Sequence, residues 1–110
     1  MVSQRVAKFE SLIQSVVAPA LAEALERDRV NATVTRVDAA PDLRQATVWI
    51  GLLGPAAEQA RLWKLVMATR GGLQAALAAQ LSSKFVPRLQ FKHDTGGEDA
   101  ARMEQLLRDL

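Results

Sequence analysis

The spacing of the hydrophobic residues changes along this chain of 110 residues, and that change limits the folds it can adopt. From Val6 to Leu25 the apolar side chains recur at intervals of three and four, which predicts an amphipathic helix with Ser3 as its N-cap. Pro19 interrupts this stretch, so a kink or a restart is expected there. From Gln45 to Leu53 the apolar side chains alternate, which predicts a half-buried strand. The chain must therefore combine helices with a sheet.

An earlier strand is predicted from Asn31 to Asp38, where valine and threonine are frequent. Residues 39–43 have turn chemistry, so the two strands are expected to form an antiparallel hairpin. Val34 and Val37 would point to opposite faces of a regular strand. A β-bulge between them would restore one apolar face.

The second half of the sequence predicts two short helices, a strand and a closing helix. Gly54 and Pro55 end the preceding strand, and a helix running to about Arg70 is expected to follow them. Gly71 and Gly72 then predict a kink before the next helix. The third strand and the closing helix are expected at residues 86–94 and 98–110. The chain is thus predicted to be an α+β protein with the order α-β-β-α-kink-α-β plus a C-terminal helix.

Composition favours one soluble domain that spans residues 1–110. With 49% hydrophobic residues the chain can form a core, and without cysteine it has neither disulfides nor a cysteine zinc site. The absence of cysteine also fits an intracellular protein better than a secreted one. Polar residues interrupt the apolar stretch from Ile13 to Leu25, so neither a membrane span nor a signal peptide is expected.

Positive charge is concentrated in the middle of the sequence. Residues 1–58 hold six basic and seven acidic side chains, and residues 94–110 hold two basic and five acidic ones. Residues 59–93 hold six basic side chains and no acidic ones, namely Arg61, Lys64, Arg70, Lys84, Arg88 and Lys92. Such a segment is typical of a surface that binds nucleic-acid phosphates, although a solvated face gives the same pattern.

The element order resembles that of the type II K-homology (KH) fold, which binds RNA in many proteins. Several stretches, in the right order and spacing, resemble the bacterial ribosome-binding factor A family. They are Arg5-Val6-Ala7, Val34-Thr35-Arg36-Val37, Pro41-Asp42-Leu43, Ala46-Thr47-Val48-Trp49-Ile50, Arg70-Gly71 and Phe85-Val86-Pro87-Arg88-Leu89-Gln90-Phe91. The resemblance spans nearly the whole chain.

This resemblance implies a three-stranded sheet with helices on one face. It also implies a non-enzymatic, cytoplasmic assembly factor that is monomeric and needs no cofactor. Such a factor binds the small ribosomal subunit and its rRNA, assists late maturation of the 16S-type RNA, and takes no small-molecule substrate and no membrane as partner. The family has an Ala-x-Gly kink where other KH proteins have a Gly-x-x-Gly loop, and Thr69-Arg70-Gly71 occupies that place here.

The candidate RNA-binding residues are the basic residues of the middle segment and its two adjacent glycines, which permit close approach of a ligand because they lack a side chain. They are Arg61, Lys64, Arg70, Gly71, Gly72, Lys84, Arg88 and Lys92.

Two other functions compete with RNA binding. A protein-interaction module would use an apolar patch around Trp49 and Trp63, although Trp49 is also placed to stack on a base. A small ferredoxin-like enzyme would need His93, which has no nucleophile or metal partner in the sequence. No catalytic residue and no metal site are therefore expected.

Overall fold

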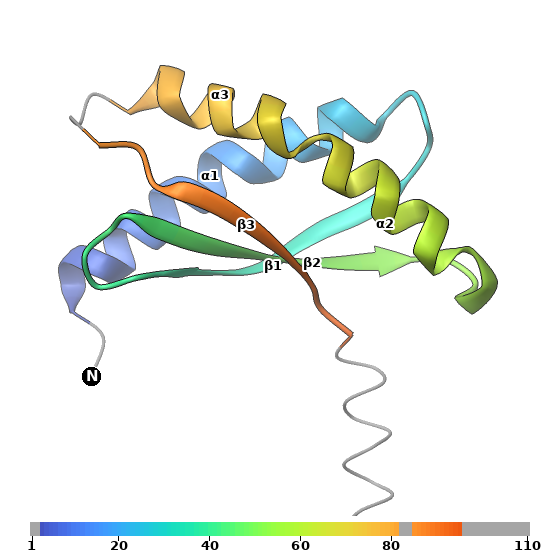
Figure 1. Ribbon diagram of the computed structural model, residues 1–110, viewed down its shortest axis with the longest axis horizontal. Helices are drawn as coiled ribbons and strands as arrows, with labels where there is room; N and C mark the ends of the chain where they lie inside the picture. Colours follow the sequence, from blue (N-terminus) through green and yellow to red (C-terminus); the bar gives the residue numbers. More distant parts are fainter. Residues whose placement is uncertain (1–2, 82–84, 96–110) are drawn as a thin grey trace, which may run out of the picture.

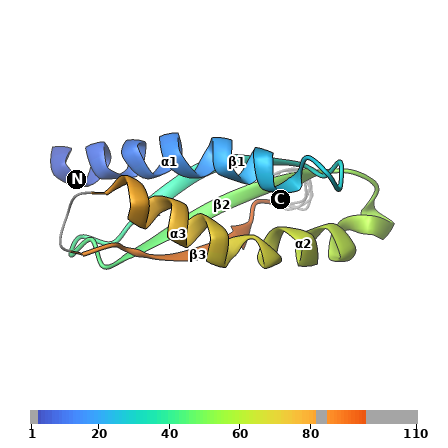
Figure 2. The ribbon, with the colours of Figure 1, turned by 90° about the horizontal axis from the view of Figure 1, so that it is seen from above.

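The computed structural model describes residues 3–81 and 85–95 of the chain. Its elements are α1 (Gln4–Leu25), β1 (Asn31–Ala39), β2 (Gln45–Leu53), the 3₁₀ turn η1 (Ala56–Glu58), α2 (Gln59–Ala68), α3 (Arg70–Gln80) and β3 (Arg88–His93) (Figure 1). The sheet has the order β1-β2-β3, with β2 antiparallel to β1 and parallel to β3. Seen from above, α1 lies beside α2 and α3 over one face of the sheet (Figure 2). The predicted closing helix at residues 98–110 lies outside the described residues.

Helix α1 is continuous from its cap to its end. The Ser3 hydroxyl accepts a hydrogen bond from the Val6 N–H at 3.1 Å, which confirms the predicted N-cap. The expected restart at Pro19 does not occur, because this exposed residue removes one backbone donor while the opposite side of the helix stays packed. The buried side chains Ile13, Val17, Leu21 and Leu25 lie four residues apart and form that packed side. Among the described residues, no helix combines the length and apolar character needed to cross a bilayer.

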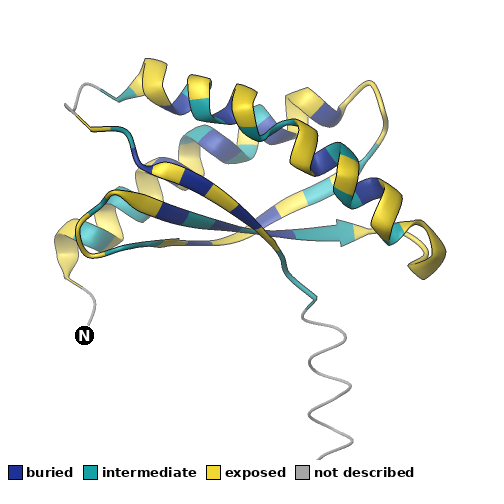
Figure 3. Ribbon diagram, viewed as in Figure 1, coloured by how far each residue is buried: buried dark blue, intermediate teal, exposed yellow. Residues whose placement is uncertain are grey.

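One face of the sheet forms the core together with the helices (Figure 3). The pairing of β1 with β2 shifts between Val34 and Arg36, which leaves Thr35 as the extra residue of a β-bulge. Val34 and Val37 are therefore both buried on the helix side, an arrangement that a regular strand without the bulge would not allow. The same face carries the buried side chains of Ala46, Val48, Ile50, Leu89 and Phe91. The opposite face of the sheet has no helix over it in the described part of the chain, and we call it the open face.

The break between α2 and α3 lies at Thr69. It falls within the Thr69-Arg70-Gly71 triplet that the family resemblance placed at the kink, but before the Gly71-Gly72 pair to which the sequence pattern assigned it. The Thr69 hydroxyl donates to the Val66 carbonyl oxygen at 2.7 Å, and the Thr69 N–H also bonds within the preceding turn. A threonine side chain that bonds in this way competes with the regular backbone ladder and bends a helix. The two glycines lie inside the first turn of α3. Helix α2 begins only at Gln59, because a 3₁₀ turn follows Pro55.

Gln74 joins α3 to the outer edge of β3. Its amide nitrogen donates to the Pro87 carbonyl oxygen at 2.8 Å, and its amide oxygen accepts from the Leu89 N–H at 2.9 Å. Because β3 is the edge strand of the sheet formed by the described residues, none of the described strands pairs with these two backbone groups. The side chain of Gln74 therefore satisfies both of these backbone groups and ties α3 to the edge of the sheet.

Replacing Gln74 with leucine should lower the free energy of unfolding by about 1–3 kcal/mol, because both partly buried backbone groups would lose their partner. Urea denaturation of purified variants measures this change. Gln80→Leu is the matched control, since Gln80 is exposed at the end of the same helix and its replacement should change stability by less than about 0.5 kcal/mol. Equal stabilities of the two variants would contradict the role assigned to Gln74.

Candidate nucleic-acid interface

Three of the predicted RNA-binding cations meet beside the break between α2 and α3. Arg70, Arg88 and Lys92 line a shallow hollow of about 310 Å³, which we call the kink pocket. The remaining lining residues are Met67, Leu89, Gln90 and Phe91. None of these described lining residues is acidic, so the pocket has a positive potential and favours an anionic ligand.

The fold holds these cations in different ways. The Arg70 guanidinium is half-buried and donates to the Leu89 carbonyl oxygen at 3.4 Å, which directs it toward the edge of β3. Arg88 and Lys92 are exposed and alternate along β3 with buried Leu89 and Phe91. This alternation of exposed and buried side chains places both cations on the open face.

The other predicted cations are less closely grouped. Arg61 and Lys64 are exposed on α2, and Arg61 forms a salt bridge with Glu58 at 3.2 Å. Both partners of that salt bridge are well exposed, so it contributes little to stability. Arg61 can therefore leave Glu58 and bind a phosphate instead. Lys84 lies outside the described residues.

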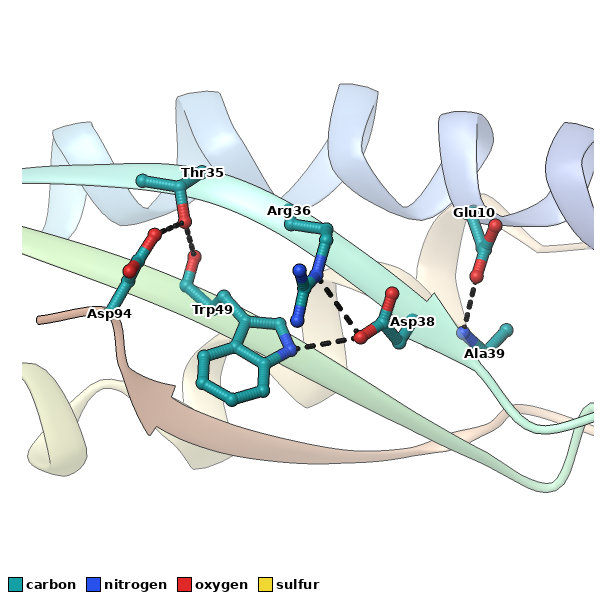
Figure 4. Close-up of polar contacts among 7 residues, drawn as sticks. All are labelled: Glu10, Thr35, Arg36, Asp38, Ala39, Trp49 and Asp94. Carbon is teal, nitrogen blue, oxygen red and sulfur yellow. Dashed lines mark hydrogen bonds and ion pairs between the residues drawn. The ribbon is translucent and has the colours of Figure 1, made fainter. Parts of the chain in front are cut away.

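The open face carries a row of three side chains across the strands, namely Arg36 on β1, Trp49 on β2 and Lys92 on β3. Figure 4 shows Arg36 and Trp49. Trp49 on β2 has the Arg36 guanidinium carbon at 4.8 Å from its ring centroid and the Lys92 ammonium nitrogen at 5.5 Å. Its indole N–H donates to the Asp38 carboxylate at 3.0 Å, and Arg36 contacts the same carboxylate at 3.2 Å. The indole is thus engaged by its neighbours, which favours a packing role over stacking on a base.

The carboxylates of the open face are bound by neighbouring groups. Asp38 contacts Arg36 and Trp49, while Asp94 accepts a hydrogen bond from the Thr35 hydroxyl at 2.6 Å (Figure 4). Thr35, the bulge residue of β1, therefore links the first strand to the residue that follows β3. These contacts reduce the repulsion that the two carboxylates would exert on a phosphate near β3.

Trp63 and His93 pack against each other. Their rings are stacked, with centroids 5.1 Å apart and planes inclined by 18°, and Trp63 is partly buried against the core. Trp49 lies on the open face among polar groups, so the two tryptophans do not form a common exposed patch. This geometry gives no support to an interaction module built on both tryptophans, and it gives His93 a packing role.

The two glycines at the start of α3 are exposed. A Cβ atom added to Gly71 or Gly72 would meet nothing within 4 Å. Gly72 lines a separate hollow of about 440 Å³ on the side of α1, so the glycines and the cations do not share one pocket. The packing of the described residues does not require glycine at either position, although glycine weakens a helix.

Sequence reasoning missed a larger hollow at the end of the molecule where α1 begins. It measures about 810 Å³ and lies between the first turns of α1, the turn between β1 and β2, and Phe85. We call it the Phe85 groove. Its cations are Arg5, Lys8 and Arg44. They belong to residues 1–58, whose acidic residues outnumber the basic ones, so the net charge of that segment does not reveal them. Only the fold brings them together.

Comparison with known proteins identifies the family. The family model described as "Ribosome-binding factor A" matches residues 5–107. This chain belongs to the ribosome-binding factor A family. The ribosome-binding factor A of Micrococcus luteus is 36% identical over 105 residues, which cover 94% of this chain and 71% of the relative. The resemblance found in the sequence is therefore confirmed.

Solved structures of ribosome-binding factor A share the fold. The crystal structure of the protein from Thermus thermophilus has a TM-score of 0.66 at 24% identity and covers 80% of this chain and 93% of that one. A homology model of the Thermus thermophilus protein, fitted into the cryo-electron microscopy map of a 30S-RbfA complex, has a TM-score of 0.52 at 24% identity and covers 74% of this chain and 90% of that one. The predicted α+β, KH-like fold class is thus confirmed.

Proposed function

We propose that this protein is a small-subunit assembly factor that binds ribosomal RNA and acts by binding alone. It works as a cytoplasmic monomer whose residues 1–110 form one domain, without a cofactor. The observation that carries the proposal is the meeting of Arg70, Arg88 and Lys92 in one pocket that no described acidic residue lines. Membership of the ribosome-binding factor A family and the 30S complex of the Thermus thermophilus protein support it.

The kink pocket suits the phosphates of a folded RNA. The Arg70 guanidinium uses one N–H group to contact Leu89 and retains further donors for phosphate oxygens. It also lies in the first turn of α3, where the helix dipole favours an anion. Arg88 and Lys92 extend the positive surface along the open face of β3, and Arg61 and Lys64 extend it along α2. Lys84 completes the set proposed from the sequence.

Binding would affect RNA maturation through occupancy. A protein that binds an immature RNA conformation more tightly than the mature one shifts the folding equilibrium by the ratio of the two affinities, and it dissociates when that preference is lost. We expect immature small subunits to bind at least about tenfold more tightly than mature ones, a difference of about 1.4 kcal/mol. Titration of labelled protein with both kinds of particle measures the ratio, and equal affinities would contradict this mechanism.

Replacing Gly71 and Gly72 with alanine should stabilise the protein and weaken its binding to small subunits. Each alanine should add about 0.5–1 kcal/mol to the free energy of unfolding, because both glycines are helical and a Cβ atom has room at each. The same Cβ atoms would obstruct close approach of an RNA backbone. Thermal unfolding and subunit titration measure the two effects.

Ala78→Gly is the control for the glycine replacements, since Ala78 is exposed later in α3. It should lower stability by a similar amount, about 0.5–1 kcal/mol, and leave binding unchanged. Unchanged or tighter binding of the alanine variants would remove the glycines from the proposed site.

A further inference from the structure

The Phe85 groove is lined by apolar side chains that the fold leaves exposed or only partly buries. Phe85 is 65% exposed and Leu12 is 42% exposed, while Phe9 and Leu43 are half-buried. Two of the three phenylalanines of the chain line this groove. Large apolar side chains gathered at one place on the surface are typical of a binding site.

The turn that forms one wall of the groove has a backbone conformation unusual for its residue. Leu43 has φ of 60°, in the left-handed region that leucine rarely adopts. The turn is held by hydrogen bonds from the Leu43 N–H to the Ala40 carbonyl oxygen at 2.8 Å and from the Arg44 N–H to Asp42 Oδ1 at 3.0 Å. Backbone strain of this kind is found preferentially where a side chain is placed for function.

The charges of the groove favour an anionic ligand. Arg5, Lys8 and Arg44 come from two different elements and are all exposed, whereas Asp42 is the one acidic residue among the lining residues that the structure describes. The Asp42 carboxylate already accepts the hydrogen bond from the Arg44 N–H. The three cations therefore surround an apolar surface with a net positive potential.

The groove adjoins the surface proposed for RNA. The Arg88 N–H donates to the Arg44 carbonyl oxygen at 2.9 Å, so the backbone of one proposed RNA-binding residue is bonded to a residue that lines the groove. Phe85 precedes Arg88 by three positions along the same segment. The groove therefore adjoins the end of β3 that carries Arg88.

We propose that the Phe85 groove binds one or two unpaired nucleotides of ribosomal RNA. This inference rests on the function proposed above. The bases lie against Phe85 and Phe9, and the phosphates lie beside Arg5, Lys8 and Arg44. Single-stranded RNA is recognised by this combination of aromatic rings and cations. The volume of about 810 Å³ falls in the range of pockets that enclose small organic ligands, about 300–1,000 Å³. An acidic peptide would satisfy the cations, but the two aromatic rings favour the flat faces of bases.

The test uses the full chain and a short single-stranded oligouridine that carries 4-thiouridine. Phe85→Ala should weaken its affinity at least about fivefold, because stacking on a base is lost. Arg5→Glu, on a different element, should cause a comparable loss. Leu53→Ala should have no effect, since Leu53 is 73% exposed at the end of β2. Photo-cross-links should map to Phe9 or Phe85, and an acidic peptide should not displace the RNA.

Parallel sedimentation with small ribosomal subunits separates the two proposals. If the wild type sediments with subunits while Phe85→Ala leaves oligouridine affinity unchanged, the groove inference is wrong and the proposed function stands. Displacement of the RNA by the acidic peptide would also overturn the inference and assign the groove to a protein partner. Failure of the wild type to sediment with subunits would overturn the proposed function and this inference together.

Discussion

Reversal of Arg88 and Lys92 to glutamate should weaken binding to small ribosomal subunits at least about tenfold, because attraction to two phosphates is replaced by repulsion. Both side chains are exposed on the open face beside the kink pocket, so the fold should tolerate the change. The dependence of log affinity on log salt concentration should also become shallower, by about one unit of slope for each lost phosphate contact. Titration of fluorescent protein with subunits at several salt concentrations measures both quantities.

A variant with Arg27 and Arg29 reversed to glutamate is the matched control. It loses the same amount of charge from the exposed turn between α1 and β1, away from the kink pocket. Its affinity for small subunits should stay within about threefold of the wild type, since charges outside an interface act mainly through the electrostatic field of the whole protein. An equal loss in the two variants would mean that binding follows net charge and does not use the kink pocket.

Replacement of Leu77 with alanine should lower the free energy of unfolding by about 2–5 kcal/mol. Leu77 is fully buried in the core, and its helix α3 packs on both α1 and β3. Loss of the side chain removes apolar burial and leaves a cavity between the two helices and the sheet. For a domain of this size the cost is a large fraction of the total stability, which is typically about 5–15 kcal/mol. Chemical denaturation of both proteins measures the difference.

Leu53→Ala provides the comparison for the core replacement, since Leu53 is 73% exposed. The same change of side chain should cost less than about 0.5 kcal/mol there. A cost below about 1 kcal/mol at Leu77 would show that α3 is not anchored by the core. Arg70, which starts this helix, would then not be held in position by the packing of α3 against the core.

Periodicity allowed much of the fold to be predicted. The interval of four between Ile13, Val17 and Leu21 is the signature of one helical face, and these residues are buried as expected. The conflict between Val34 and Val37 pointed to a bulge, which the structure has at Thr35. In both cases the regular repeat of the helix or strand backbone determines the direction in which each side chain points. The spacing of apolar residues in the local sequence is therefore sufficient for the prediction.

Features that depend on side-chain hydrogen bonds or on contacts between distant segments were predicted only in part. The helix break lies at Thr69 because a side-chain hydroxyl competes with the backbone, whereas the two glycines that suggested the kink remain helical. Gln74 has no distinctive sequence signal, since its partners are backbone groups of β3 and the segment before it. The Phe85 groove brings together Arg5 and Arg44, which lie far apart in the sequence. Counting the charges of successive segments does not detect such a cluster.

The most direct test of the central claim is the affinity of the unmodified protein for small ribosomal subunits as a function of salt concentration. Three phosphate contacts at Arg70, Arg88 and Lys92 predict that log affinity falls with log salt concentration with a slope of about −2 to −3. The cations of α2 and of the Phe85 groove would make the slope steeper. An affinity that stays constant or rises with salt would indicate docking through apolar surface and would contradict a site built on phosphate contacts.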